Sequence, residues 1–206
     1  MQYLWLLVPL FMALMRLVTR KYVFSALVTL SCAVIALIPG VDASGLIMAA
    51  GLLFSIAGDY LLAHQHGKSA VFIEGVACFG IAHVLFILYA VQRFMFRPLA
   101  VGFIIVLAAF YALYLTRRVL PGQPQAMKGA LSGYALVSLM GLFAALSMDA
   151  AGAERTLYII GIACIVFSDT MIAEAEFAGH RQAHTLILPT YYLCHVLLAA
   201  SRLAAI

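Results

Sequence analysis

The sequence predicts an all-α integral membrane protein, a bundle of about eight transmembrane helices. Three observations support this fold class. Of the 206 residues, 66% are hydrophobic and 10% are charged, whereas a soluble domain holds about 25% charged residues. The apolar residues form runs of about 20, the length with which a helix crosses the hydrocarbon core. The runs are continuous rather than alternating, which indicates helices and not the strands of a barrel.

Eight apolar runs follow one another along the chain, with short polar loops between them. The first run has no basic start and no small-residue cleavage site, so it is predicted to be a retained span and not a signal peptide. The segment RRVLPGQPQAMK at 117–128 separates the fifth run from the sixth, and its two prolines and glycine are typical of a turn. In order, the predicted spans are 2–18, 22–39, 44–63, 70–92, 97–116, 127–148, 155–175 and 184–205. Together they predict a single transmembrane domain over residues 1–206.

The lysines and arginines lie mostly between the spans and indicate the topology. The loops after the first, third, fifth and seventh spans hold eight of them, and the other side, which carries both termini, holds four. Cytoplasmic loops carry the excess of Lys and Arg, so both termini are expected outside the cytoplasm. In a prokaryote the membrane would be the inner one. The net charge of +4 is explained by these loops, and no nucleic-acid partner is expected.

Two spans resemble each other. The third contains GDYLLAH and the seventh contains SDTMIAE, and a histidine follows in the next span in both cases. The aspartates Asp59 and Asp169 are 110 residues apart, and the histidines His83 and His195 are 112 apart. A shift of four spans keeps the same orientation in the membrane, so the pattern is compatible with two parallel four-helix repeats.

Five ionisable residues fall inside the predicted spans: Asp59, Glu74, His83, Asp169 and His195. Each costs about 2.5–3.5 kcal/mol at mid-bilayer on insertion scales, so each is a candidate functional residue. The alternative is that buried pairs hold the helices together. Both aspartates lie about three quarters of the way along their spans, on the side of the basic loops, which is the common depth that one polar cavity would require.

Two carboxyl groups in a poorly solvated pocket can divide the work of acid–base catalysis. One remains protonated and acts as the acid, while the other is ionised and activates water. Tyr191 and His195 are four residues apart on one helix face and can touch. No set of metal ligands with suitable spacing is present, so no metal or other cofactor is expected.

Several motifs carry a resemblance to a known family. They are SIAGD at 55–59, FIEGVACFGIAH at 72–83, FSD at 167–169 and PTYYLCH at 189–195. In their order and spacing they resemble the YhhN/TMEM86 family, eight-span membrane proteins whose characterised members are lysoplasmalogenases. The resemblance implies hydrolysis of the vinyl ether bond of a lysoplasmalogen, with a fatty aldehyde and a glycerophospho-base as products. The implied partner is therefore a lysophospholipid substrate in the membrane.

The resemblance also implies roles for particular residues. Asp59 and Asp169 are the implied catalytic carboxylates, and we take Asp59 as the acid. The supporting polar groups that it implies are His83, Tyr192 and His195, with Ser55 or Ser168 as a hydrogen-bond donor to a carboxylate. Many relatives carry Gln near the position of His195. Glu74 matches none of the motifs and is left as a third acid or a local partner.

The alternative function is a small proton-coupled transporter that uses the same buried carboxylates. Such transporters usually have helices broken by Gly or Pro at matching positions of the two halves. Pro9, Pro39, Pro98 and Pro189 do not pair in this way, and only Pro189 lies well inside a span. The sequence therefore favours the hydrolase.

Overall fold

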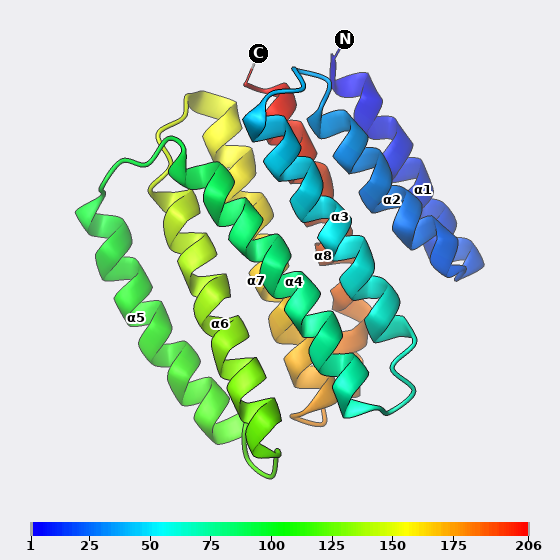
Figure 1. Ribbon diagram of the computed structural model, residues 1–206, viewed down its shortest axis with the longest axis vertical. Helices are drawn as coiled ribbons and strands as arrows, with labels where there is room; N and C mark the ends of the chain where they lie inside the picture. Colours follow the sequence, from blue (N-terminus) through cyan, green and yellow to red (C-terminus); the bar gives the residue numbers. More distant parts are fainter. Residues whose placement is uncertain (1, 206) are drawn as a thin grey trace.

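The computed structural model describes residues 2–205, and in this part of the chain it contains eight α-helices and no β-strand. Figure 1 shows them as one bundle with both termini at the same end. The helices are α1 (Leu7–Thr19), α2 (Tyr22–Ala36), α3 (Ala43–Ala63), α4 (Ser69–Val91), α5 (Pro98–Tyr114), α6 (Gln125–Leu146), α7 (Gly152–Glu176) and α8 (His184–Leu203). Three short segments extend them: the 3₁₀ turns η1 (Gln2–Leu6) before α1 and η3 (Arg181–Ala183) before α8, and the π-helical turn η2 (Leu115–Val119) after α5.

The eight predicted spans correspond to the eight helices, and the fold-class prediction is confirmed. Seven helices of the described residues are long and apolar enough to cross a membrane, counting η1 with α1 and η2 with α5. The exception is α2, predicted at 22–39, which ends at Ala36 after 15 residues. At 1.5 Å per residue it is about 22 Å long, against about 30 Å of hydrocarbon. Pro39 explains the early end, because proline disfavours helical geometry in the residue before it.

The helix contacts of the two halves of the chain follow the same scheme. In the first half α1 packs on α2, α2 on α3 and α3 on α4, and in the second half α5 packs on α6, α6 on α7 and α7 on α8. The halves are joined by two contacts, α2 against α8 and α6 against α4. If the helices are counted in a circle, so that α1 follows α8, a shift of four helices converts one contact into the other. This correspondence supports the predicted repeat.

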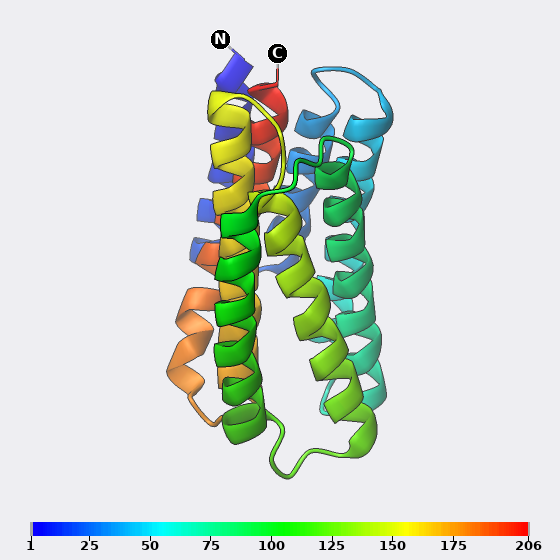
Figure 2. The same cartoon turned by 90° about the vertical axis from the view of Figure 1, so that its left-hand side faces the viewer.

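Helices α1 and α5 form the two edges of the bundle, as Figures 1 and 2 show. Each has a single buried residue, Pro9 in α1 and Ala100 in α5. Most of their remaining side chains are apolar and exposed or half-buried, which suits two helices that face lipid. The packed interior is thus formed mainly by the other six helices, and α1 and α5 add a few side chains at its edge, among them Arg16 and Tyr111.

Glycines bring α3 and α4 into close contact. A Cβ atom at Gly58 would lie 2.8 Å from the ring of Phe79, and one at Gly51 would lie 2.5 Å from the ring of Phe86. The two aromatic rings are almost completely buried, so they fill the space that a side chain on α3 would need. This packing fixes the position of α3 against the face of α4 that carries Phe79 and Phe86.

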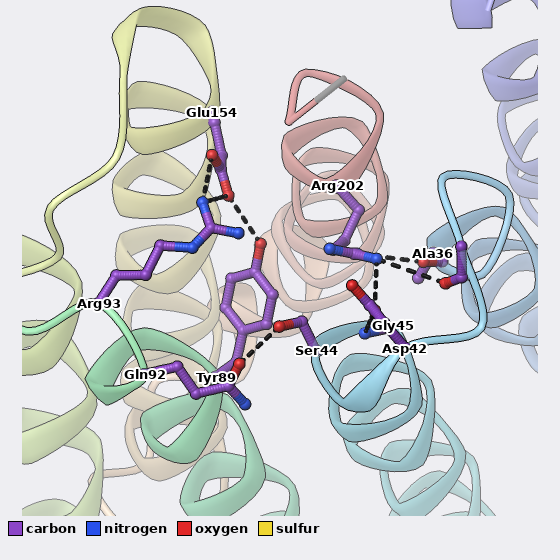
Figure 3. Close-up of polar contacts among 10 residues, drawn as sticks. Ala36, Asp42, Ser44, Gly45, Tyr89, Gln92, Arg93, Glu154 and Arg202 are labelled. Atoms are coloured by element: carbon purple, nitrogen blue, oxygen red, sulfur yellow. Dashed lines mark hydrogen bonds and ion pairs between the residues drawn. The ribbon is translucent and has the colours of Figure 1, made fainter.

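The end of the bundle that holds the termini is closed by polar contacts, which Figure 3 shows. Arg202 of α8 is 3% exposed, and it donates to Asp42 Oδ1 at 2.9 Å and to the carbonyl oxygen of Ala36 at 3.2 Å. Asp42 also accepts the backbone N–H of Gly45 at 2.7 Å and so caps α3. One residue thus ties the start of α3 to the end of α8.

A second contact at this end joins α4 and α7. The Nη1 atom of Arg93 donates to both carboxylate oxygens of Glu154, at 2.8 and 2.7 Å, and the hydroxyl of Tyr89 donates to the same carboxylate at 3.0 Å. Glu154 is buried, and its charge is compensated by these donors. These contacts join the ends of α3, α4, α7 and α8 at this end of the bundle.

Candidate active site

Asp169 lies in a polar cluster formed by three helices. The hydroxyl of Tyr134, on α6, donates to Asp169 Oδ2 at 2.7 Å, and Nε2 of His83, on α4, is 3.5 Å from the same oxygen. The His83 side chain is 1% exposed and that of Asp169 is 11% exposed. The sequence predicted both His83 and Asp169 as site residues, and the structure brings them together.

The hydrogen bonds of His83 fix the position of one proton. Its Nδ1 atom lies 3.0 Å from the carbonyl oxygen of Phe79, which can only accept, so Nδ1 carries hydrogen. In the neutral ring, Nε2 then has no hydrogen and carries a lone pair, which faces the carboxyl oxygen of Asp169. Two acceptors this close in a buried site would repel each other. No hydrogen bond joins Nε2 to Asp169 among residues 2–205, so a shared proton, as carboxylic acid and imidazole or as carboxylate and imidazolium, would make this contact favourable.

Asp59 lies in a second polar cluster, on α3. The ionisable groups around its carboxyl include Tyr191 on α8 and Arg16 at the end of α1, together with Tyr22 and Tyr192. Its Oδ2 atom is buried and has no hydrogen-bond partner among residues 2–205. Buried polar atoms are nearly always satisfied, so an unpartnered carboxyl oxygen is a natural position for a ligand or a reacting water.

The rest of this cluster is formed by α2 and α8. Tyr192 shares a hydrogen bond of 2.7 Å with Ser25, and Nδ1 of His195 lies 2.9 Å from the hydroxyl of Thr29. The rings of Tyr191 and His195 are 4.2 Å apart, as their spacing predicted. Tyr191, Tyr192 and His195 thus lie together in the Asp59 cluster rather than beside Asp169.

The two clusters occupy equivalent places in the two halves. The Asp169 cluster is formed by α7, α6 and α4, and the Asp59 cluster by α3, α2 and α8. Adding four to each helix number, in cyclic order, converts one set into the other. The 110-residue spacing of the aspartates therefore corresponds to a real equivalence of position.

Each aspartate lines its own hollow, and the two hollows are adjacent. The one beside Asp59 has a volume of about 410 Å³, and the one beside Asp169 is a narrow slot of about 50 Å³. Three residues line both: Leu62, Phe72 and Ile172. Leu62 and Ile172 are themselves 110 residues apart, so the wall between the hollows lies where the two halves meet.

The two hollows differ in polarity. The slot is lined by apolar and aromatic side chains, and its polar groups are Asp169 and the hydroxyls of Tyr111 and Tyr134. The wider hollow is rich in polar and charged groups: Arg16, Tyr22, Ser25, Asp59, Gln65, Glu176 and His184. Side by side, they offer one polar and one apolar compartment, each with a carboxyl group.

Three predicted supporting residues are placed differently from the prediction. Glu74 is exposed on α4 and lines neither hollow, because the inward face of this helix carries positions 72, 75, 79 and 83. The hydroxyl of Ser55 donates to the backbone carbonyl of Gly51, and that of Ser168 donates to the carbonyl of Ile187. Both serines are buried, and both hydroxyl hydrogens go to backbone carbonyls instead of to a carboxylate.

Four residues of the two clusters were not predicted as site residues. Arg16 was counted only as a topology signal, and Tyr134, Ser25 and Thr29 were not singled out. A signal for Tyr134 does exist, since it is the one large polar side chain in the small-residue segment ALSGYALVS of α6. Ser25 and Thr29 are four residues apart and so share one face of α2.

Within residues 2–205, no three side chains of His, Cys, Asp or Glu lie close enough together to hold a metal ion. Neither the comparison with curated proteins nor that with solved structures gives a match. The comparison with protein families matches the model described as the YhhN family over residues 20–202. This range covers most of the chain and includes both aspartates, His83, Tyr134 and α8 except its last residue. The chain therefore belongs to the YhhN family.

Proposed function

We propose that the protein is an intramembrane hydrolase that cleaves the vinyl ether bond of lysoplasmalogens. Its family membership supports this, as does the activity of the characterised lysoplasmalogenases of that family. The observation that carries the proposal is the pair of carboxyl groups, Asp59 and Asp169, on either side of one wall between a polar and an apolar hollow.

We assign the two hollows to the two ends of such a lipid. A lysoplasmalogen has a polar head group and a single apolar chain, and the vinyl ether joins them. We place the head group and glycerol in the wide hollow beside Asp59, and the first carbons of the alkenyl chain in the slot beside Asp169. The reacting bond then lies near Leu62, Phe72 and Ile172, with a carboxyl group on each side.

The reaction requires one proton donor and one base. A proton is added to the vinyl carbon that bears the chain, and the carbon bonded to oxygen becomes part of an oxocarbenium ion. Water adds to that second carbon and gives its proton to the base, forming a hemiacetal. The hemiacetal then breaks its bond to the glycerol oxygen, which takes up the hydroxyl proton, and yields the aldehyde and the glycerophospho-base. One water is consumed, and the acid and base exchange one proton overall.

The position of each carboxyl group suggests its role. The carbon that receives the proton is on the chain side, next to the apolar slot, so we assign the acid to Asp169 with the proton that it shares with His83. We take the water from the polar side and so assign the base to Asp59, which lines the wide hollow and whose Oδ2 has no hydrogen-bond partner among residues 2–205. This assignment reverses the expectation from the sequence, in which Asp59 was taken as the acid.

The experiment is aldehyde release from a lysoplasmalogen by the purified protein in detergent. Asp59→Asn and Asp169→Asn are each expected to lower kcat by about a hundredfold or more, the usual contribution of a general acid or base. Asp149→Asn is the matched control, because Asp149 is 56% exposed beside Arg97 in a loop at the other end of the molecule. In D₂O, the aldehyde should carry one deuterium on the carbon next to the carbonyl, since the proton is delivered to carbon.

Wild-type protein that releases no aldehyde from choline or ethanolamine lysoplasmalogens would overturn the proposal. The transporter would then be tested by substrate-coupled proton uptake in liposomes, again with the two aspartate variants. Activity that survives both substitutions would also overturn the assignment of the carboxyl groups.

A further inference from the structure

The outer part of the wide hollow carries charged groups that the proposed reaction does not use. Arg16 lies at the end of α1, and Glu176 is the last residue of α7. Both line the hollow, together with Gln65 from the loop after α3 and His184 at the start of α8. Asp59 lines the same hollow, so these groups and the proposed base face one shared space.

Arg16 has unused hydrogen-bonding capacity. Its Nε atom is buried and has no hydrogen-bond partner among residues 2–205. Residues 2–205 contain six ion pairs, and none of them includes Arg16. A guanidinium group presents its N–H donors in a planar fork that matches phosphate geometry. Arg16 can therefore receive a phosphate without first breaking an ion pair.

Glu176 supplies the opposite charge. Its carboxylate is 36% exposed, and its nearest ionisable partner is His184, whose Nε2 is 3.9 Å away. This contact is too long for a hydrogen bond, so both oxygens of the carboxylate remain able to accept from an ammonium group. The hollow thus presents a cationic and an anionic side chain from different helices. Arg16 lies near Tyr192 and Asp59, and Glu176 lies near His184.

We propose that Arg16 and Glu176 form a subsite for a zwitterionic phospho head group. The guanidinium of Arg16 binds the phosphate, and the carboxylate of Glu176 faces the ammonium of ethanolamine or choline. The inference rests on the proposed function, since it orients the lipid that is hydrolysed. It assigns the two charges of the head group to named side chains and predicts that Glu176 disfavours an uncharged glycerol head.

The phosphate arm of the test compares two substrates. One is the ethanolamine lysoplasmalogen, and the other is the matching 1-alkenylglycerol, which has the same vinyl ether but no phosphate. In Arg16→Gln, the ratio of kcat/KM for the first to kcat/KM for the second is expected to fall about tenfold or more, because a charge-assisted contact is lost. Arg20→Gln is the control, since Arg20 lies four residues later, is exposed and lines neither hollow.

The use of a ratio separates recognition from chemistry. Arg16 is also near Asp59, and an effect through that carboxyl would change both substrates by the same factor and leave the ratio at the wild-type value. That outcome would overturn the subsite.

The ammonium arm uses Glu176→Gln with ethanolamine and glycerol head groups on the same alkenyl chain. The wild-type preference for ethanolamine is expected to fall about threefold to tenfold, as for one partly exposed charge pair. Glu174→Gln is the control, because Glu174 lies on the same helix but pairs with His180 and does not line the hollow. An unchanged preference in Glu176→Gln would remove Glu176 from the subsite.

A binding measurement distinguishes failure of the subsite from failure of the proposed function. The probe is 1-acyl lysophosphatidylethanolamine, which has the head group but no vinyl ether. Weaker binding to Arg16→Gln than to wild type and Arg20→Gln, by about tenfold, supports the subsite even where no aldehyde is released. Equal binding to all three proteins overturns it, whatever the hydrolytic activity.

Discussion

At the scale of single residues, hydrogen-bond geometry gives the two aspartates different surroundings. Asp169 accepts a hydrogen bond from Tyr134, and its Oδ2 atom lies 3.5 Å from Nε2 of His83. Asp59 has a buried carboxyl oxygen with no partner in residues 2–205. In a site with little water, such differences decide which carboxyl holds a proton and which accepts one. Two aspartates at equivalent positions can thus have opposite roles.

Tyr134→Phe tests the surroundings of Asp169. It removes the donor to Oδ2 but keeps the ring, so we expect kcat for aldehyde release to fall about tenfold to a hundredfold with little change in thermal stability. Tyr158→Phe is the contrasting variant, because the Tyr158 hydroxyl donates to the carbonyl of Phe86 in the core and lines neither hollow. It should cost about 1 kcal/mol of stability and leave kcat near the wild-type value. Full activity in Tyr134→Phe would contradict a role for this hydroxyl.

At the scale of the helices, the ends decide where the site can open. At the end with the termini, Asp42 caps α3 and binds the buried Arg202 of α8. The backbone N–H of Gly45, and after it the charge of Arg202, hold the pKa of Asp42 below its usual value of 3.8. The ends of α1, α3 and α7 on the other side contribute Arg16, Ala63 and Glu176 to the wide hollow. The hollow is therefore reached from the end that Asp42 does not close.

The lowered pKa of Asp42 predicts a pH dependence of stability. Because the folded pKa lies below the unfolded one, the ionised carboxylate adds stability above pH 3.8, and this stability is lost as the pH falls through the folded pKa. Asparagine caps a helix about as well as aspartate, so Asp42→Asn removes the charge and keeps the cap. The Tm of the wild type should exceed that of the variant from about pH 5 upward, and the difference should disappear toward pH 2. A difference in Tm that did not vary with pH would contradict this.

At the scale of the whole molecule, the two halves are alike in helix packing but differ in side chains. The shared scheme places Asp59 and Asp169 at equivalent positions, and the wall between their hollows contains the equivalent residues Leu62 and Ile172. The charges are not shared, since Arg16 and Glu176 both line the hollow of Asp59 and neither lines that of Asp169. A symmetric frame with asymmetric lining suits an amphiphilic substrate with one polar and one apolar end.

The distribution of Lys and Arg predicts the orientation of the molecule. The loops at the end where the wide hollow opens hold eight of these residues, against four at the end with the termini. The hollow is therefore expected to face the cytoplasm and the termini the opposite side. In a bacterial host, a C-terminal alkaline phosphatase fusion should be active and a C-terminal green fluorescent protein fusion should be dark. The reverse result would show that the termini are cytoplasmic.

Much of the fold could be predicted from the sequence, because a long apolar run in lipid satisfies its backbone hydrogen bonds by forming a helix. The bounds of α3, α4 and α7 differ from the predicted spans by at most three residues at either end. The end of α2 was predicted too late, since hydropathy continues through Ile38 although Pro39 ends the helix earlier. Asp59, His83 and Asp169 could be predicted as site residues because an ionisable side chain inside an apolar run raises the free energy of membrane insertion. Tyr134 and Thr29 are uncharged at neutral pH and have a smaller insertion cost, so the sequence did not mark them as site residues.

The sequence by itself determined the membrane class, the number of helices, and the two carboxyl groups near one end of the bundle. These three properties depend only on the composition of each apolar run and on the position of a residue within it. Only the tertiary structure decided which polar groups surround each carboxyl. It placed His83 and Tyr134 with Asp169, and Tyr191 and Arg16 with Asp59. Those neighbours come from helices distant in sequence, and contacts between helices depend on packing that no single span encodes.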